Sequence, residues 1–197
     1  MYGQTTAGVG RPPLVDSDRR LVVASGGGRY AEAAMAGRLF YGANINMVNT
    51  STTLHTTFSG LALANPIGSG KNIIVHEFGY AFVVAAASGA VLALATTINT
   101  GNFAQDGTEA QPKCTRDGYA VPVGILDEGA TIVAPTIVKI ISQHADAATS
   151  TYQSGAQVVD LQGSIILVPG RALVTDTTVA AGAASAQFSF MWEEVDV

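Results

Sequence analysis

The sequence predicts an all-β protein, a single jelly-roll-like β-sandwich with an extended N-terminal arm. From Leu39 onward, short apolar runs alternate with turn sequences rich in Gly, Asp and Pro, and no stretch has the period of a convincing amphipathic helix. Roughly nine strands spaced in this way, in one chain of 197 residues, are typical of a sandwich or jelly roll. The first 37 residues instead carry glycines and prolines that break regular elements.

Each predicted strand is an alternating or continuously apolar run bounded by turn signals. The runs are Arg38–Tyr41, Leu54–Leu63, Asn72–Val84, Ala90–Ile98, Tyr119–Val123, Thr131–Ser142, Gln157–Val168, Arg171–Thr177 and Gln187–Val195. Dipeptides such as Asp117-Gly118 and Pro169-Gly170 mark the turns between them. We expect one or two helical turns over Tyr30–Ala36, and a long loop over residues 99–118 that reaches out from one end of the domain.

We divide the chain into an extended N-terminal arm, residues 1–37, and a β-sandwich domain, residues 38–197. The arm has few apolar anchors, only Leu14 and the run Leu21-Val22-Val23. A segment of this kind is floppy when it is free. We therefore expect the arm to become ordered against another polypeptide, for which a neighbouring subunit is the simplest candidate.

The charge balance argues against nucleic acid as the main ligand, because phosphate binding needs clustered Lys and Arg. The net charge is −5, and only 13% of residues are charged, against roughly 25% in an average soluble domain. Residues 1–38 carry five arginines and three acidic residues, whereas the rest of the chain carries five basic and twelve acidic residues. A basic arm on an acidic body suits docking within an assembly, since opposite charges steer contact.

Neither a membrane span nor secretion is expected. The segment 78–98 is long and apolar enough for a span, but Ser88-Gly89 in its middle indicates a turn between two buried strands. The first residues lack the basic start and apolar core of a signal peptide. The one cysteine, Cys114, excludes an internal disulfide and fits assembly in a reducing cytoplasm.

The C-terminal third carries the most specific pattern. Residues 158–167, VVDLQGSIIL, lead through Pro169-Gly170 into a second strand, and FSFMWEEV follows at 188–195. This arrangement resembles the last hairpin of jelly-roll virion proteins from tailed bacteriophages. The stretches GVGRP at 8–12, LVDSD at 14–18 and GGGRY at 26–30 are similar to the N-terminal arms of such proteins.

The resemblance implies a capsid cement or decoration protein, a homotrimer on the head surface that binds the major capsid protein. We expect its arm interface to comprise Arg11, Leu14, Arg19, Arg20, Leu21, Val23 and Arg29. Trp192 continues the alternating series of Phe188 and Phe190, so it should face the core or a subunit interface. The alternative is a fibre, collar or tail-tip component that binds a receptor or glycan, which predicts exposed aromatic residues around the 99–118 loop.

No catalytic, metal or cofactor site is predicted. Gly68-Ser69-Gly70-Lys71 resembles part of a phosphate-binding loop, but Asn72 and a strand follow where that loop needs Ser or Thr and a helix, so we expect a hairpin turn. The three histidines, His55, His76 and His144, have no two-His ligand spacing, and His76 and Glu77 should point to opposite faces of a strand.

The acidic pairs Asp127-Glu128 and Glu193-Glu194 are expected to be solvated strand ends or turns. Adjacent residues on a strand point to opposite faces, so neither pair is a ready acid/base couple. The Gly-x-Ser-x-Gly elbow of a serine hydrolase is also missing from the sequence. The residues therefore favour a non-enzymatic protein that needs no cofactor.

Overall fold

The computed structural model describes residues 3–4, 10–11, 28–48, 60–82, 90–105, 111–144, 154–178 and 186–197. The chain divides into two units, residues 1–32 and 33–197. In the first unit, β1 (Gly3–Gln4) pairs antiparallel with β2 (Gly10–Arg11). The short helix expected near residues 30–36 is α1 (Ala31–Met35).

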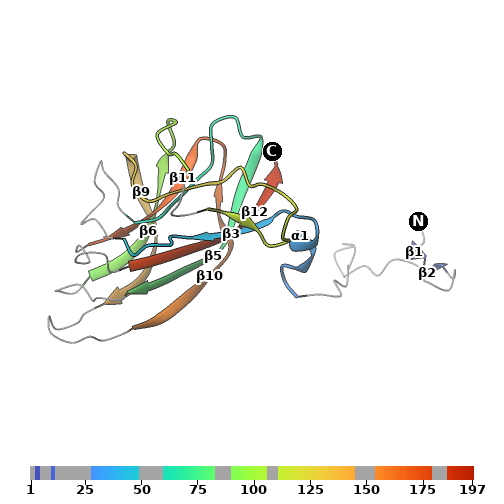
Figure 1. Ribbon diagram of the computed structural model, residues 1–197, viewed down its shortest axis with the longest axis horizontal. Coiled ribbons are helices and arrows are strands. Elements are labelled where there is room, and N and C mark those ends of the chain that lie inside the picture. The colour runs from blue at the N-terminus through green and yellow to red at the C-terminus, as the bar shows by residue number, and fades with distance from the viewer. Residues whose placement is uncertain are drawn as a thin grey trace. The chain divides into compact units, whose positions relative to one another are not determined.

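Two five-stranded antiparallel sheets pack face to face, so the prediction of an all-β sandwich is confirmed (Figure 1). The first, here named the β5 sheet, has the order β10 (Ser154–Leu167), β5 (Lys71–Phe82), β12 (Ala186–Asp196), β3 (Leu39–Ala43), β7 (Lys113–Cys114). The second, named the β6 sheet, has the order β8 (Ile125–Asp127), β4 (Ala62–Ala64), β11 (Arg171–Thr177), β6 (Ala90–Ile98), β9 (Val133–His144).

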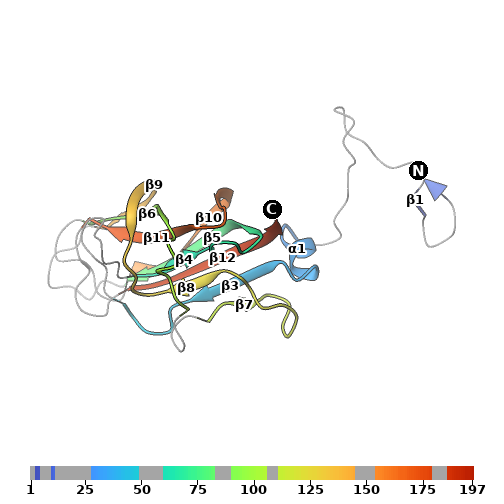
Figure 2. The ribbon, with the colours of Figure 1, turned by 90° about the horizontal axis from the view of Figure 1, so that it is seen from above.

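Eight of these strands pair in the manner of a jelly roll. In chain order they are β3, β4, β5, β6, β9, β10, β11 and β12, and β3 pairs with β12, β4 with β11, β5 with β10, and β6 with β9. Rolling up one long antiparallel ribbon gives this pairing. Strands β7 and β8 come from the segment between β6 and β9 and extend one edge of each sheet. The other two edges are β9 and β10, which lie on the same side of the sandwich (Figure 2).

The two sheets contribute different side chains to the core between them. The β5 sheet supplies aromatic rings, namely Phe40, Phe78, Tyr80, Phe82, Phe188, Phe190 and Trp192, whereas the β6 sheet supplies Leu63, Leu92, Leu94, Leu126 and Leu173. Phe78 stands 5.2 Å from Phe190 and 5.9 Å from Phe188 between ring centroids. Trp192 is fully buried, 6.2 Å from Phe40, so its side chain faces the core. Side chains thus fill the interior, as in other small sandwiches.

Sequence pattern located most strands closely. The predicted runs Ala90–Ile98 and Arg171–Thr177 match β6 and β11 end to end. The run Leu54–Leu63 is only partly testable, because residues 54–59 lie outside the described residues and β4 begins at Ala62. The segment 78–98 contributes the end of β5 and the whole of β6. Across the described part of the chain, no helix has the length and apolarity needed to cross a bilayer.

The strand predicted over Tyr119–Val123 is wrong. These residues form no strand, and the segment instead contributes β7 before them and β8 after them. Pro122 has no N–H to donate to a ladder, and the N–H of Val123 donates to a side-chain carboxylate instead of to a neighbouring strand. Val121 is 91% exposed, so the alternating pattern here does not reflect burial.

The predicted long loop over residues 99–118 lies partly against the domain. Phe103 is buried and packs on the outer face of the β6 sheet with Ala130 and Ile132. Beneath them lie small side chains of three strands, Ala62, Ala64, Ala95, Ala172 and Val174. The expectation that this segment reaches out is therefore wrong at Phe103, while residues 106–110 lie outside the described residues.

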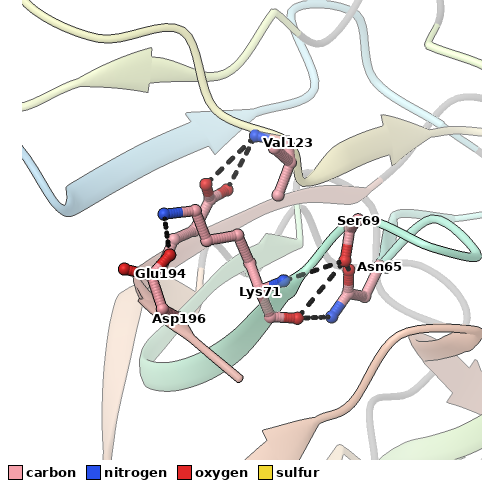
Figure 3. Close-up of polar contacts among 6 residues, drawn as sticks. All are labelled: Asn65, Ser69, Lys71, Val123, Glu194 and Asp196. Atoms are coloured by element: carbon pink, nitrogen blue, oxygen red, sulfur yellow. Dashed lines mark hydrogen bonds and ion pairs between the residues drawn. The ribbon is translucent and has the colours of Figure 1, made fainter.

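Asn65 joins two of the connections along which the chain crosses between the sheets, β4 to β5 and β10 to β11, and Figure 3 shows its contacts in the first of them. Its amide nitrogen donates to the carbonyls of Lys71 and Leu167, each at 2.8 Å, and its amide oxygen accepts from the Ser69 hydroxyl at 2.6 Å. The turn at Gly68–Gly70 connects β4 and β5, which belong to different sheets. It is therefore a crossover and not the expected hairpin turn. Lys71 starts a strand, and its ammonium donates to Asp196 at 2.6 Å, which lowers the pKa of that carboxyl.

Candidate functional site

A row of small residues crosses the outer face of the β5 sheet. Gly79 on β5 pairs with Ser189 on β12, and Ser189 pairs with Ala43 on β3. The chain neighbours of each of these residues are buried, so all three belong to the face that points away from the core. Because three adjacent strands carry almost no side chain at this level, the sheet is hollowed there.

The hollow continues across the face as a trough. Two adjoining hollows of about 220 Å³ each share Ala43, Gly79, Val158 and Ser189 in their linings. We name these four residues the trough floor. Val158 pairs with Gly79 and is 68% exposed, so its side chain stands at the β10 end of the floor.

Larger side chains stand on both sides of the floor. One wall is a row across three paired strands, Glu77, Met191 and Tyr41. On the other side, Gln187 carries an amide side chain and pairs with Ala81, whereas the side chain of Gln157 lies on the inner face, where it accepts a hydrogen bond from the Tyr80 hydroxyl at 2.6 Å. Tyr41 is 50% exposed, and its neighbour on β7 is Lys113. The trough is therefore bordered by an aromatic ring, a carboxylate and one amide.

Gly79 is required by the close approach of β12. A Cβ atom on Gly79 would lie 2.3 Å from the Ser189 hydroxyl oxygen. Any side chain at position 79 would therefore push Ser189 away and fill the floor. The glycine keeps the trough open at its centre.

Acidic groups gather beside one end of the trough. Glu77 and Asp160 occupy directly paired positions on β5 and β10, which places two carboxyl groups side by side on the same face. Glu193 lies on this face too, where it pairs with Arg38 at 3.2 Å and with His76 at 3.4 Å. This end of the sheet therefore disfavours an anionic ligand.

His76 and Glu77 do not point to opposite faces as expected. The pairing with β12 passes from Glu77 to Val75 without a partner for His76, which makes His76 the extra residue of a β-bulge. Val75 and Phe78 both face the core, so the two residues between them share the outer side. Nevertheless, the described residues contain no group of His, Cys, Asp or Glu that could hold a metal ion.

Two carboxylates that were expected to be solvated are buried and have structural roles. Glu194 accepts hydrogen bonds from the N–H groups of Val123 and Gly124 and from the Trp192 indole at 3.1 Å (Figure 3 shows the Val123 contact). Asp127 accepts from the N–H groups of Ala104 and Gly129. Each carboxylate ties a loop of the segment between β6 and β9 to the sandwich. Sequence pattern cannot reveal the donors that are distant in sequence, Ala104 for Asp127 and Val123 and Gly124 for Glu194.

Edge strand β9 exposes a group of aliphatic side chains, here named the β9 patch: Val133, Ile137, Val138 and Ile140. Ile137 and Ile140 pair with Ala95 and Ala93 on β6, so they are neighbours on the outer face of the β6 sheet. The pairing of β9 with β6 shifts at three places. Such bulges twist an edge and hinder the addition of another strand. The exposed feature is thus a set of side chains, not a straight backbone edge.

A second hollow, of about 430 Å³, lies in the segment between β6 and β9. Residues 111–114 and 117–122 line it. Tyr119 borders this hollow and is 58% exposed, with the Arg116 guanidinium 4.3 Å from its ring centroid. Gly37 has φ +69° and lies against the same ring, where a Cβ would overlap it. The glycan-binding alternative predicts exposed aromatic residues around the 99–118 loop, and Tyr119 is an exposed aromatic residue directly after that segment.

The predicted arm interface falls mostly outside the described residues. Leu14, Arg19, Arg20, Leu21 and Val23 lie outside the described residues. Arg11 pairs with Gly3 through the backbone of β1 and β2. Arg29 is exposed, with its guanidinium 5.1 Å from the Tyr30 ring centroid.

Sequence reasoning missed the trough, because a row of small residues on three strands becomes visible only once the register is known. No family model, curated protein or solved structure matches the chain, so a functional proposal rests on its own geometry.

Proposed function

We propose that this chain is a non-enzymatic structural protein of a tailed-bacteriophage particle. In this proposal it is a capsid cement or decoration protein that forms a homotrimer, binds the major capsid protein and stabilises the head. Its assembly takes place in the host cytoplasm. The free energy of the additional interfaces holds the shell together, since anything that binds only the assembled state stabilises that state.

The observation that carries the proposal is the β9 patch. Single exposed aliphatic residues are normal on a protein surface, but a contiguous group marks an interaction site. Four such residues lie within one edge strand, and two of them are neighbours on the same face. A second copy that packs on Ile137 and Ile140 would remove both from water, at about 25 cal/mol for each Å² covered.

Composition and fold support the same role. Only 13% of residues are charged, which suits a surface that is partly covered by partners. Jelly rolls are common in virus shells, although they also occur in lectins and in cupins. Fold alone does not establish function, so the surface patch remains the stronger support.

Self-association is tested with a pair of matched variants. Ile140 is 70% exposed within the β9 patch, and Ile67 is 67% exposed on a crossover turn outside it. In light scattering after size-exclusion chromatography, we expect the unaltered chain to be a trimer, Ile140→Asp to be a monomer, and Ile67→Asp to remain a trimer. An unaltered chain that stays monomeric at its highest soluble concentration would refute self-association.

The location is tested in intact particles. Antibodies against the chain should label heads in electron micrographs, and deletion of residues 2–29 should abolish incorporation while leaving a folded oligomer. Labelling of a fibre or tail tip would instead support the second candidate, a component with a receptor- or glycan-binding role. The exposed ring of Tyr119 beside the second hollow favours that candidate.

A further inference from the structure

We infer that the outer face of the β5 sheet binds the same face of a second copy of this chain, in a twofold dimer contact. This interface is separate from the β9 patch, which belongs to the other sheet, and it does not depend on the proposed structural role. One row of side chains, with acidic groups at one end and a basic group at the other, carries the inference.

The row crosses all five strands of the β5 sheet. Its members are directly paired from β10 to β7, and we name them the charged row: Asp160, Glu77, Met191, Tyr41 and Lys113. Side chains of directly paired residues lie on the same face of a sheet. Phe78 and Trp192, which are chain neighbours of row members, belong to the core. The whole row therefore lies on the outer face, with two carboxylates at the β10 end and an ammonium at the β7 end.

Charges at both ends of the row are left for a partner to meet. Among the residues that the structure describes, neither Glu77 nor Lys113 takes part in an ion pair. Lys113 is exposed, and Tyr41 beside it is 50% exposed. Between the two charged ends, Met191 and Tyr41 form an apolar centre that a partner can cover.

The order of the charges makes the row complementary to itself. Met191 lies on β12, the middle strand, so a half-turn about an axis along β12 places the acidic end of one copy over the basic end of the other. Asp160 then faces the partner's Lys113, and this contact occurs twice because a twofold interface is isologous. A half-turn about an axis across the strands would instead stack the two Asp160 carboxylates, which repel each other. The charge order thus selects one orientation of the two copies.

The face is large enough for such a contact. Neighbouring strands lie about 4.8 Å apart, so the row is about 19 Å long. The two longest strands that cross its centre, β5 and β12, have 12 and 11 residues and extend about 35 Å. These lengths enclose at most about 700 Å², close to the ~800 Å² that each partner buries in a standard interface. Packed sheets stand about 10 Å apart, and the four-carbon stem of Lys113 helps to span that gap.

The trough beside the row gives the apolar centre room to close. Gly79, Ser189 and Ala43 keep the floor low, and Met191 borders it. Methionine fills irregular gaps because its side chain is unbranched and flexible. A foreign protein is the competing occupant of this face. It would need a row of its own with the reversed order of charges, whereas a second copy supplies that row by symmetry.

Sedimentation velocity over a concentration series measures the contact in the Ile140→Asp background, which removes the proposed β9 contact. Above the concentrations at which this variant is a monomer, we expect a monomer–dimer equilibrium that weakens as salt rises. Lys113→Glu makes both ends of the row acidic, and the dimer Kd should rise at least about tenfold, because two attractive contacts become repulsive. Arg171→Glu is the matched control, since it changes the charge equally at an exposed residue of the β6 sheet. Its Kd should stay within about twofold.

A charge exchange tests the twofold arrangement itself. Asp160→Lys makes both ends of the row basic and should also prevent dimers. A mixture of Lys113→Glu and Asp160→Lys should form heterodimers, because each end then faces an opposite charge, and the double variant should regain homodimers. Circular dichroism of every variant should match that of the background chain.

The inference is overturned if the background chain never dimerises, if Lys113→Glu behaves like Arg171→Glu, or if the mixture stays monomeric. A foreign protein that binds the row while the purified chain remains a monomer would overturn it as well. Dimers in this background, in a chain whose unaltered form never reaches a trimer, would leave this inference standing while the proposed trimer fails. Trimers of the unaltered chain without dimers in the background would do the reverse.

Discussion

Replacing Glu194 with alanine removes one carboxylate that accepts hydrogen bonds from three N–H groups, those of Val123, Gly124 and Trp192. The carboxylate is buried, and Gly124 and Trp192 are buried with it. A buried donor left without an acceptor costs about 1–3 kcal/mol. Val123 is only half-buried, so water can replace part of its lost contact.

Two fully buried donors at about 2 kcal/mol each give a loss of about 4 kcal/mol in the free energy of unfolding. For a chain of 197 residues, each kcal/mol lowers Tm by about 2–4 °C, so Tm should fall by about 10 °C. Glu194→Gln keeps one acceptor oxygen and should lose about half as much. Glu193→Gln alters only the outer face, where an ion pair with Arg38 is partly solvated, and should cost about 1 kcal/mol or less.

Chemical unfolding followed by circular dichroism gives the free energies. Trp192 fluorescence reports the local environment, since it is the one tryptophan of the chain. Hydrogen exchange at the Val123 and Gly124 amides should accelerate in Glu194→Ala, because both lose their acceptor. The reasoning is refuted if Glu194→Ala costs no more than Glu193→Gln, or if exchange at these two amides is unchanged.

Three further predictions concern residues that hold the sandwich together. Asn65→Ala removes two donated hydrogen bonds and one accepted at the crossovers, and should lower the free energy of unfolding by about 3 kcal/mol in urea titrations. Phe103→Ala uncovers the small side chains on the outer face of the β6 sheet, and should cost about 3 kcal/mol with increased binding of a hydrophobic dye. Asp196 has a pKa below its ordinary value of 3.8 because of Lys71, so the ion pair stabilises the fold fully above pH 3.8 and less as pH falls further. Lys71→Ala should therefore lower the free energy of unfolding more at pH 7 than at pH 3.

Local pattern predicted the strands whose burial alternates without interruption. On β12, buried and partly buried residues alternate from Ala186 to Val195, and this alternation is why Trp192 faces the core. The end of β6 and the start of β11 were predictable because Asn99 follows the first apolar run and Pro169-Gly170 precede the second. In each of these cases the neighbouring residues in sequence contain the information.

The errors have a common physical cause, which is contact between residues distant in sequence. A bulge opposite β12 turned His76 outward. The N–H groups of Val123 and Gly124 donate to the Glu194 carboxylate, which offsets the cost of burying its charge. Because the Val123 N–H is used in this way, it is not free to pair with a neighbouring strand. Register between strands decided the orientation of His76, and it depends on the whole sheet.

The two open edges of the jelly roll bear on how copies of the chain could associate. Strand β10 pairs irregularly with β5 at two places, and β9 pairs irregularly with β6 at three. Ala134, at φ +46°, and Pro135 interrupt β9 further. Bulges and proline hinder strand addition, which protects both edges from uncontrolled polymerisation. The aliphatic side chains of the β9 patch remain exposed despite this protection. An interface that uses them would therefore be made by side-chain packing with defined geometry, and such packing can close into a small symmetric oligomer, whereas open edges would extend without limit.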